Sequence, residues 1–372
     1  MALVQAQQGI DSLSVDLSFY SRHFYDDEFA NNINFQYGGR TYEDMYLING
    51  YDGNVDLVIA FLGFGLGFDS AGRVNRGTVT SLAEMTYSGQ DIWFIQDISV
   101  SASRLNSVAS TSSNADDRGL ISSVLSGNDR IQLSAYDDRF EGWGGNDLMF
   151  GGDGNDTLLG GDGNDQLVGG VGHDALHGGA GDDRLSDTGG ANLLDGGLGN
   201  DALNGGAGDD RLIGGGGSDT ISGQGGHDRL EGGDGGDRLF GQDGADQIQG
   251  GAGHDIIIGG AGDDLLFGGA GNDDLAAQGG RDMLDGGAGN DLLRGGAGQD
   301  RFVFTSGMDT VRNFDEAQDL VDLRGVAGLD DWADVQARLF QAGHHVEFRQ
   351  GADTLRIEWT RLADLGSDDF LW

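Results

Sequence analysis

One large apolar residue recurs every nine positions through the middle of the chain. With residue 151 as position one of a nine-residue unit, the register holds without insertion or deletion from residue 124 to residue 303. Position eight is apolar in every unit, as in Ile131, Leu158 and Phe302. Because side chains alternate along a strand, a three-residue strand at positions seven to nine buries position eight and turns its neighbours outward. The pattern therefore predicts one core residue per unit.

The other six positions of each unit are rich in glycine. Between residues 142 and 303 the units read G-G-x-G-x-D-x-U-x, where U is the apolar residue. Position four is always Gly, and position one is Gly except at Asp187 and Ala277. Glycine accepts the positive φ angles of tight turns, so these positions predict turns between stacked strands. We predict an all-β fold of tandem nonapeptides in which short strands and turns stack in coils, with two units per coil.

Position six carries the chemistry of the repeat. It is Asp in each of these units except at Asn192. Two units per coil place these side chains in two rows, where carboxylates about 5 Å apart repel and need a cation between coils. Carboxylate and carbonyl oxygens favour a hard ion, above all Ca²⁺. The predicted metal-site residues are Asp147, Asp156, Asp165, Asp174, Asp183, Asp201, Asp210, Asp219, Asp228, Asp237, Asp246, Asp255, Asp264, Asp273, Asp282, Asp291 and Asp300.

These units resemble the RTX (repeats-in-toxin) calcium-binding nonapeptides. In that family the fold is a parallel β-roll, a right-handed β-solenoid of tandem nonapeptides, and position-six Asp side chains and turn carbonyls bind Ca²⁺ between coils. The resemblance therefore implies an all-β parallel β-roll for this chain. The resemblance implies multiple Ca²⁺ ions as cofactors, about 14 if the inter-turn sites fill. The unit that begins at Asp187 has Asn192 at position six, so we expect a weakened or missing site there. The units of Asp129 and Asp138 lack most glycines, and we interpret them as a ramp into the roll.

The flanks differ from the repeats and give three predicted parts. Residues 1–123 are a β-rich N-terminal module of unknown role, 124–303 the calcium-binding β-roll, and 304–372 a C-terminal cap with a secretion signal. In the first part, residues 57–68 predict a buried strand and residues 92–110 a strand that enters a helix. The segment after Val303 is similar to the one that closes the roll in serralysin-type proteases. Its matching residues are Asp309, Thr310, Phe314, Asp315, Asp319, Val321, Asp322 and Leu323.

The cap also carries local structural signals. DDWADVQARLF, from Asp330, predicts a helix with an Asp N-cap and Trp332, Val335 and Leu339 at helical spacing. Residues 344–359 alternate as a hairpin around a glycine-containing turn. The final SDDFLW resembles the uncleaved C-terminal signal read by type I secretion systems, and no N-terminal secretory signal is visible. We therefore expect type I export and a secreted, extracellular or cell-surface location.

The charge excludes several classes of partner. The chain carries 62 acidic and 21 basic side chains, a net charge of −41, which disfavours a compact state. It also argues against nucleic acid and anionic membranes, which select basic surfaces. The longest apolar run is too short for a transmembrane segment. Cysteine is absent, so disulfides and thiolate metal sites are excluded. The expected partners are calcium ions, the type I secretion apparatus and a cell-surface polysaccharide or protein.

No motif for catalysis accompanies the repeats, so we assign no catalytic residue. The sequence lacks the His-Glu-x-x-His of RTX proteases and the Gly-x-Ser-x-Gly of RTX lipases. Our hypothesis is a secreted calcium-binding β-roll protein that folds on calcium after type I export, without enzymatic activity of its own. An enzyme or toxin with its active part in residues 1–123, and a calcium-dependent adhesin or matrix protein, are the alternatives.

Two further groups of residues have more than one interpretation. Three histidines lie at position five of their units, where we interpret them as surface turn residues. They are His173, His227 and His254. Four apolar residues at outward positions form a local cluster in the sequence that suits association or shielding by the cap. They are Ile256, Ile258, Leu265 and Phe267.

Overall fold

The structure is a computed structural model of the chain. It describes residues 127–133 and 137–372 in full and, within residues 1–126, the backbone of eight strands. The chain divides into two compact units, Met1–Val171 and Gly172–Trp372. Among the described residues, no helix has both the length and the apolar character needed to cross a membrane.

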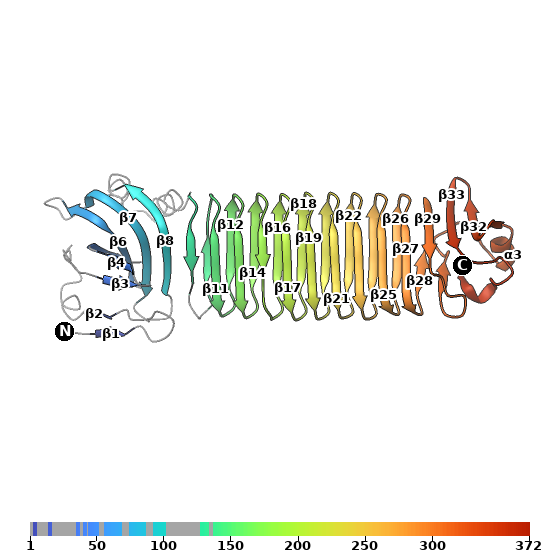
Figure 1. Cartoon of the computed structure of the whole chain (residues 1–372), viewed down its shortest axis with the longest axis horizontal. Helices are drawn as coiled ribbons and strands as arrows, with labels where there is room; N and C mark the ends of the chain where they lie inside the picture. The colour runs from blue at the N-terminus through green and yellow to red at the C-terminus, as the bar shows by residue number, and fades with distance from the viewer. Residues whose placement is uncertain are drawn as a thin grey trace. The chain divides into compact units, whose positions relative to one another are not determined.

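The first unit begins with strands that precede the repeats. β5 to β8 pair in chain order as antiparallel neighbours, and β8 pairs with β9. β6, β7 and β8 lie side by side (Figure 1). The strand predicted at 57–68 is present as β6, whereas the helix expected after β8 lies outside the described residues. The strands are β1 (Leu3–Gln5), β2 (Ser14–Asp16), β3 (Phe35–Tyr37), β4 (Arg40–Tyr42), β5 (Asp44–Tyr51), β6 (Asp56–Phe68), β7 (Val74–Thr86) and β8 (Ile92–Ser101).

The repeats of the first unit form two parallel sheets. In one sheet Met149 of β11 pairs with Ile131 of β9 and Leu167 of β13. In the other, Phe140 of β10 pairs with Leu158 of β12. All three pairs are 18 residues apart, the predicted length of one coil. The strands are β9 (Arg130–Gln132), β10 (Arg139–Glu141), β11 (Leu148–Asp153), β12 (Thr157–Asp162) and β13 (Gln166–Val171).

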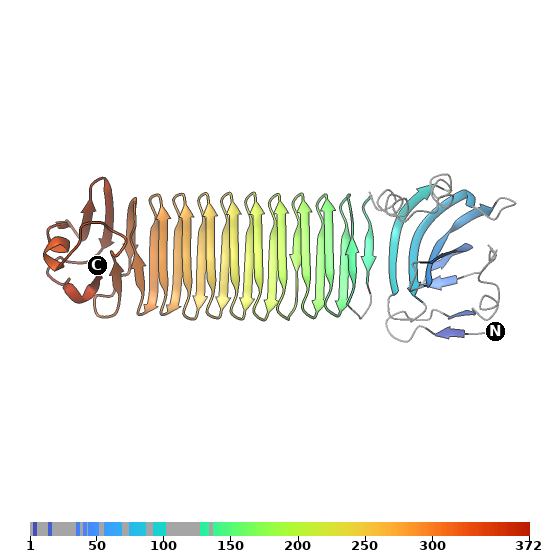
Figure 2. The same ribbon diagram turned by 180° about the vertical axis from the view of Figure 1, so that it is seen from behind.

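The second unit contains the same arrangement over more coils. Consecutive strands alternate between two sheets, and Leu212 of β18 pairs in parallel with Leu230 of β20. Figures 1 and 2 show the strands side by side, with turns along both long edges. The strands are β14 (Ala175–Ala180), β15 (Arg184–Ser186), β16 (Leu193–Leu198), β17 (Ala202–Ala207), β18 (Arg211–Gly216), β19 (Thr220–Gly225), β20 (Arg229–Asp234), β21 (Arg238–Asp243), β22 (Gln247–Ala252), β23 (Ile256–Ala261), β24 (Leu265–Ala270), β25 (Asp274–Gly280), β26 (Met283–Ala288), β27 (Leu292–Gly298) and β28 (Arg301–Val303).

Most strands of the repeat are longer than the sequence predicted. β20 covers positions seven to nine and continues through the first three residues of the next unit, Gly232, Gly233 and Asp234. Gly233 has a φ of 115° and still pairs with Gly215 and Gly251. Because glycine takes positive φ without strain, the backbone keeps its ladder while it bends toward the next turn. The turn itself is confined to positions four to six.

The position-eight side chains form the core, as predicted. Leu158, Leu212 and Leu293 are fully buried, and each pairs with an apolar residue 18 positions away within its own unit of the fold. Burial of one leucine stabilises a fold by about 1.5–3 kcal/mol. One such residue per nine is a sparse core for a chain so rich in glycine. The predicted fold class, an all-β parallel β-roll, is therefore confirmed.

The outward apolar cluster that the sequence suggested is not one surface. Ile256 and Ile258 lie on β23, in the sheet that contains β21 and β25. Leu265 and Phe267 lie on β24, in the sheet that contains β22 and β26. Because consecutive strands of the roll belong to different sheets, residues nine apart point to different faces.

The cap closes the second unit by strand pairing with both sheets. β29 pairs with β27 and β33, while β30 pairs with β28 and β34. The predicted hairpin is present as antiparallel β32 and β33. Asp331 caps the predicted helix through its Oδ1, which accepts the Asp334 N–H at 3.1 Å. The elements are β29 (Met308–Arg312), β30 (Leu320–Asp322), α3 (Trp332–Gln336), β31 (Leu339–Ala342), β32 (His345–Gln350), β33 (Asp353–Glu358), η2 (Ser367–Asp369) and β34 (Phe370–Leu371).

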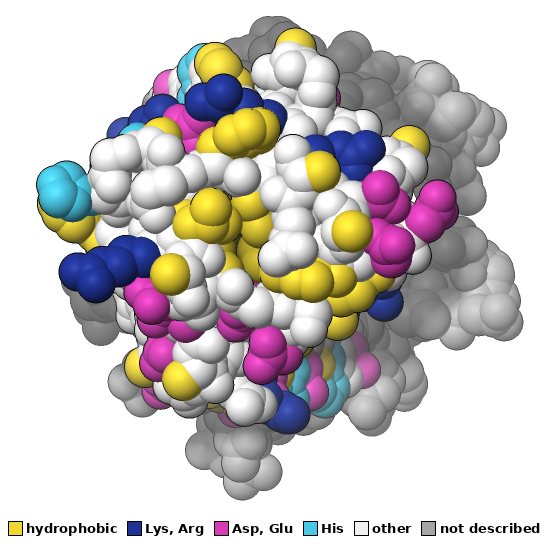
Figure 3. Space-filling view, turned by 90° about the vertical axis from the view of Figure 1, so that its right-hand side faces the viewer, with side chains coloured by type: hydrophobic (Ala, Val, Ile, Leu, Met, Phe, Trp, Pro, Cys, Tyr) yellow, Lys and Arg dark blue, Asp and Glu magenta, His cyan; other side chains and the backbone are white. Residues whose placement is uncertain are grey.

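The helix of the cap is shorter than its apolar spacing predicts. It ends at Gln336, and Leu339 begins β31 instead of continuing the helix. Trp332 packs against the rings of Phe370 and Trp372, so the helix helps to hold the end of the chain. Figure 3 views the molecule from the cap end. It shows hydrophobic side chains near the middle of that end, with basic and acidic side chains around them.

Candidate metal centre

The structure places the predicted metal-site aspartates in two rows of turns. All seventeen are at most 3% exposed, although they lie in a protein with a strongly negative charge. Successive members of a row are 18 residues apart, as are Asp219, Asp237 and Asp255. Neither row contains arginine or lysine. Burial of so many carboxylates requires a partner for each of their oxygens.

One carboxylate oxygen of most of these aspartates accepts a backbone N–H of the neighbouring coil. Asp237 Oδ1 accepts the backbone N–H of Asp219 at 2.8 Å, and Asp255 Oδ1 accepts that of Asp237 at 2.8 Å. The same bond recurs along the rows at 2.7–3.1 Å. These bonds fix the side-chain rotamer and aim the second oxygen, Oδ2, away from the backbone donor.

The second oxygen is buried without a hydrogen-bond partner in much of each row. This holds, within the described part of the chain, for the Oδ2 atoms of Asp129, Asp147, Asp201, Asp210, Asp219, Asp228, Asp237, Asp246, Asp255, Asp264, Asp273, Asp282, Asp291 and Asp300. A buried charged oxygen without a partner is costly. Such a regular set of unpaired oxygens indicates that something absent from the polypeptide completes the turns.

A backbone carbonyl oxygen lies beside the unpaired carboxylate oxygen. A Cβ added at Gly214 would lie 2.6 Å from the carbonyl oxygen of Gly232 and would collide with Asp219 Oδ2. The same pair recurs at Gly241, where the two oxygens belong to Gly259 and Asp246. In these units position one is therefore glycine, because its missing side chain leaves the space on which the two oxygens converge.

Burial makes the ionised carboxylates unfavourable in these turns. Burial, with the neighbouring Asp237 and Asp201 carboxylates adding to it, raises the pKa of Asp219 to about 6. Burial raises the pKa of Asp264 and of Asp210 to about 7 despite the hydrogen bond that each accepts. Burial and repulsion between carboxylates thus both raise the pKa of these groups, and a cation between the coils would lower it.

These donors fit a calcium ion. No group of three or more His, Asp or Glu side chains converges in the described residues, so one turn cannot form a site from side chains alone. Two coils together offer carboxylate oxygens and backbone carbonyl oxygens, the ligand set that Ca²⁺ takes in flexible geometry. Zinc prefers nitrogen and sulfur ligands. Cysteine is absent, and the turn histidines His227 and His254 already accept backbone N–H groups through Nδ1. The donor chemistry and the glycine-lined space therefore fit Ca²⁺ between coils.

Asn192 satisfies its turn without an ion. Its Oδ1 accepts the Asp174 N–H at 2.8 Å, as an aspartate Oδ1 would. Its Nδ2 takes the place of the unpaired oxygen and donates to the Gly205 carbonyl at 3.5 Å. Gly205 stands 13 residues after Asn192, the same offset that separates Gly232 from Asp219. An amide hydrogen therefore meets the carbonyl that elsewhere faces a carboxylate.

The rows extend beyond the residues that the sequence singled out. Asp129, in a unit interpreted as a ramp into the roll, is 5% exposed and donates its N–H to Asp147 Oδ1, so it joins one of the rows. Asp309 accepts the Asp291 N–H, and burial raises its pKa to about 8. Asp319 accepts the Asp300 N–H through Oδ1 and the Asp315 N–H through Oδ2. Its turn therefore ends one row without an unpaired oxygen.

Position five forms a second ladder outside the metal rows, which the sequence analysis missed. Asn200 Oδ1 accepts the Ser218 N–H at 2.8 Å. His227 and His254 accept through Nδ1 from Ala245 and Asn272, at 2.9 and 2.7 Å. The signal was present in the sequence, because position five is mostly Asn, Asp, Ser or His, all of which carry an acceptor.

The nonapeptides form two parallel sheets, and buried carboxylates face carbonyl oxygens in the turns along both edges. This arrangement defines a calcium-binding β-roll. The RTX calcium-binding nonapeptide repeat family matches half of the chain, at residues 125–158, 150–185, 177–212, 186–221, 204–239, 240–275 and 276–311. The chain therefore belongs to this family, and its repeats bind multiple Ca²⁺ ions.

Other comparisons add less. No curated protein matches the chain. The crystal structure of the extracellular lipase LipA from Serratia marcescens matches with 18% sequence identity and a TM-score of 0.29. The alignment covers 61% of this chain and 45% of the lipase, so the chain spans less than half the length of that protein.

Proposed function

We propose that this protein is exported by a type I secretion system in an unfolded state and folds outside the cell when calcium fills its turns. Its role there is non-enzymatic, in the extracellular space or at the cell surface. The seventeen position-six aspartates are the proposed Ca²⁺ ligands, with the position-one carbonyls of the adjacent coil. One observation carries the proposal: buried carboxylate oxygens without a partner face carbonyl oxygens in turn after turn.

The mechanism is linkage between ion binding and folding. An ion that binds the folded chain and not the unfolded chain stabilises the fold by about 2.7 kcal/mol per site when its concentration is 100-fold above Kd. Without ions, carboxylate repulsion and the entropy of 72 glycines oppose a core of one apolar residue per nine. Low calcium therefore favours an extended chain that can pass an exporter, and millimolar calcium favours the roll.

Far-ultraviolet circular dichroism of the full chain tests the folding step. In EGTA the spectrum should be that of a largely unfolded chain, and calcium should restore the β signal cooperatively. Magnesium at the same concentration serves as the control, since it binds poorly to large carbonyl-rich sites. A chain that is equally folded in EGTA and in calcium would rule out the proposal.

Export needs a separate test because folding on calcium does not establish it. The full chain is expressed in a bacterial host with and without a type I exporter. The proposal predicts its appearance in the medium only with the exporter. Calcium-dependent folding without exporter-dependent release would keep the first half of the proposal and overturn the second.

A further inference from the structure

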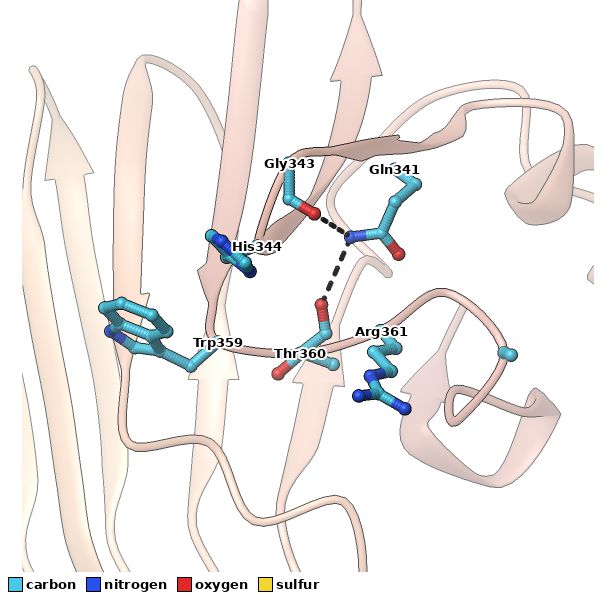
Figure 4. A pocket seen from close by; sticks show the side chains of 7 residues that line it. Gln341, Gly343, His344, Trp359, Thr360 and Arg361 are labelled. Atoms are coloured by element: carbon cyan, nitrogen blue, oxygen red, sulfur yellow. Dashed lines mark hydrogen bonds between the residues drawn. The ribbon is translucent and has the colours of Figure 1, made fainter.

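An open pocket of about 520 Å³ lies in the cap, at a distance in sequence from both aspartate rows. Its lining includes His344 from the turn between β31 and β32, and Trp359 and Arg361 from the segment after β33. Figure 4 shows these side chains around Thr360 and Gln341. The calcium mechanism uses none of these residues.

Trp359 is held in a conformation that a large side chain rarely adopts. Its φ is +63°, in the left-handed region, and its side chain is left 78% exposed. A non-glycine residue is strained in this conformation because its Cβ crowds the backbone. Exposure of a large aromatic ring adds no core packing in return. Strain of this kind is characteristic of ligand-binding positions, where the surrounding structure enforces it.

The indole is also set in a fixed orientation. Its ring stacks on that of His344, with centroids 5.8 Å apart and planes 24° from parallel. Gln341 ties the two segments together: its Nε2 donates to the carbonyls of His345 and Thr360, at 2.9 and 3.4 Å. Its Oε1 accepts the Leu362 N–H at 2.7 Å. His344 therefore supports one face of the indole, and the exposed opposite face is preorganised for a ligand.

Arg361 supplies a cation that the protein itself does not use. The other arginines of the cap are engaged: Arg312 pairs with Glu358, and both Arg349 and Arg356 pair with Glu347. Within the described residues, Arg361 is exposed and makes no ion pair or side-chain hydrogen bond. An unpaired guanidinium presents a planar fork that matches a carboxylate.

We propose that this pocket binds a carboxylated sugar ring, such as a uronate unit of an acidic polysaccharide. The face of the Trp359 indole opposite His344 takes the C–H face of the sugar ring, and Arg361 pairs with the sugar carboxylate. A lining of Gln, Thr, His and Arg suits a hydroxyl-rich ligand better than a lipid chain. The inference rests on the proposed function only for its extracellular setting, because the pocket contains no calcium ligand.

Saturation-transfer NMR on the full chain in a fixed calcium concentration tests the inference. The probes are tetragalacturonate, the single sugar galacturonate, the neutral maltotetraose, and benzoate as an aromatic carboxylate. We expect transfer to the ring protons of both uronates, tighter binding of the tetramer, and at least tenfold weaker binding of maltotetraose and benzoate. Tetramer binding without single-sugar binding would still support the site, as one that needs a polymer.

Two substitutions separate the parts of the site. Trp359→Asn should abolish uronate binding without lowering Tm, because asparagine tolerates the left-handed conformation. Arg361→Gln should weaken tetragalacturonate about tenfold, the cost of one charge-assisted hydrogen bond. Arg211→Gln, an exposed arginine on β18, is the matched control and should change nothing.

Three results would overturn the inference. They are no uronate binding by the unsubstituted chain, unchanged binding after both substitutions, and equal binding of the neutral and acidic probes. A large fall in Tm for Trp359→Asn would assign the tryptophan a structural role and would also count against it. Circular dichroism of each sample reports the calcium-folded roll separately. A folded roll without uronate binding therefore rejects the pocket and leaves the proposed folding mechanism intact.

Discussion

The roll and the cap of the second unit bury acidic side chains in two different ways. In the roll, Asp219 and Asp264 leave an oxygen without any protein partner, and burial raises the pKa of both groups. In the cap, Asp322 is bound by Arg324 through both oxygens, at 2.9 and 2.8 Å, and pairs with Arg301. Burial opposes ionisation there too, but the two arginines lower the pKa of Asp322 to about 2.

The difference teaches where each region obtains its positive charge. The cap carries its own cations, so its ion pairs form whenever the chain folds. The roll has no basic side chain in its aspartate rows and must take cations from solution. One chain therefore joins a calcium-dependent region to a cap in which arginines balance a buried carboxylate, that of Asp322.

Removal of calcium should have the largest effect, because it should destabilise the roll much more than the cap. Hydrogen exchange with mass spectrometry, in calcium and in EGTA, should show loss of protection in residues 193–298 by several orders of magnitude. Residues 345–358 of the cap hairpin should retain more protection, because their carboxylates need no ion. Equal loss in both regions would show that the cap depends on the roll for its stability and would remove the distinction.

Acidification without calcium should have the next largest effect, with opposite signs in the two regions. A carboxyl whose folded pKa is raised contributes stability that is full below about 3.8 and is lost as pH rises. For the roll residues Asp219, Asp210 and Asp264 this loss occurs as pH passes about 6, 7 and 7. The EGTA-treated chain should therefore gain β structure as pH falls from about 8 toward 4.

The cap should respond to acid in the other direction. Asp322 has a lowered pKa, so its contribution is present above about 3.8 and is lost as pH falls toward 2. Circular dichroism in EGTA should then show a maximum of β structure near pH 4, with a decline on both sides. A β signal that only decreases from pH 8 to pH 4 would contradict the account of the aspartate rows.

Single substitutions at position six should sharpen the comparison at the level of one turn. Asp237→Asn gives a row the amide that Asn192 has, so calcium stoichiometry should fall and unfolding in calcium should become easier by about 2–3 kcal/mol per site lost. Asn192→Asp should do the reverse: it should add calcium and make the calcium-free chain less stable. Native mass spectrometry and thermal melts in calcium and in EGTA measure both.

The control for Asp237→Asn removes one negative charge from the same nine-residue unit. Asp234→Asn alters an exposed acid at position three, close to Asp237 in sequence. Its calcium stoichiometry should not change. If this control behaves like Asp237→Asn, the effect is one of net charge and the assignment of position six is wrong.

The roll was predictable because its periodicity leaves little choice. A period of nine, with two units per coil, fixes which residues pair at a distance of 18, and it places Leu212 beside Leu230 without any tertiary information. The metal rows follow from the same arithmetic. The place of Asp319 in its row does not follow from this arithmetic, because one extra residue between it and Asp300 breaks the 18-residue spacing. Only the pairing of β30 with β28 places Asp319 beside Asp300.

The cap was predictable only in its local elements. Asp331 predicts the start of the helix, and the alternation in β32 and β33 predicts the hairpin. The early end of the helix at Gln336 and the left-handed φ of Trp359 arise from how these elements pack on one another. No periodic signal reports such packing, so the uronate pocket has no counterpart in the sequence pattern.

The smallest expected effect concerns the outer ladder at position five. Asn200→Ala removes the acceptor of the Ser218 N–H and should destabilise the calcium-bound roll by about 0.5 kcal/mol, since water can replace an exposed partner. Ala191 offers no such acceptor to Asp209, one coil later, so Ala191→Asn should stabilise by a similar amount. Thermal melts in calcium measure both, and neither change should alter calcium stoichiometry. If Asn200→Ala costs as much as Asp237→Asn, the outer ladder and not the ion row holds the coils in register.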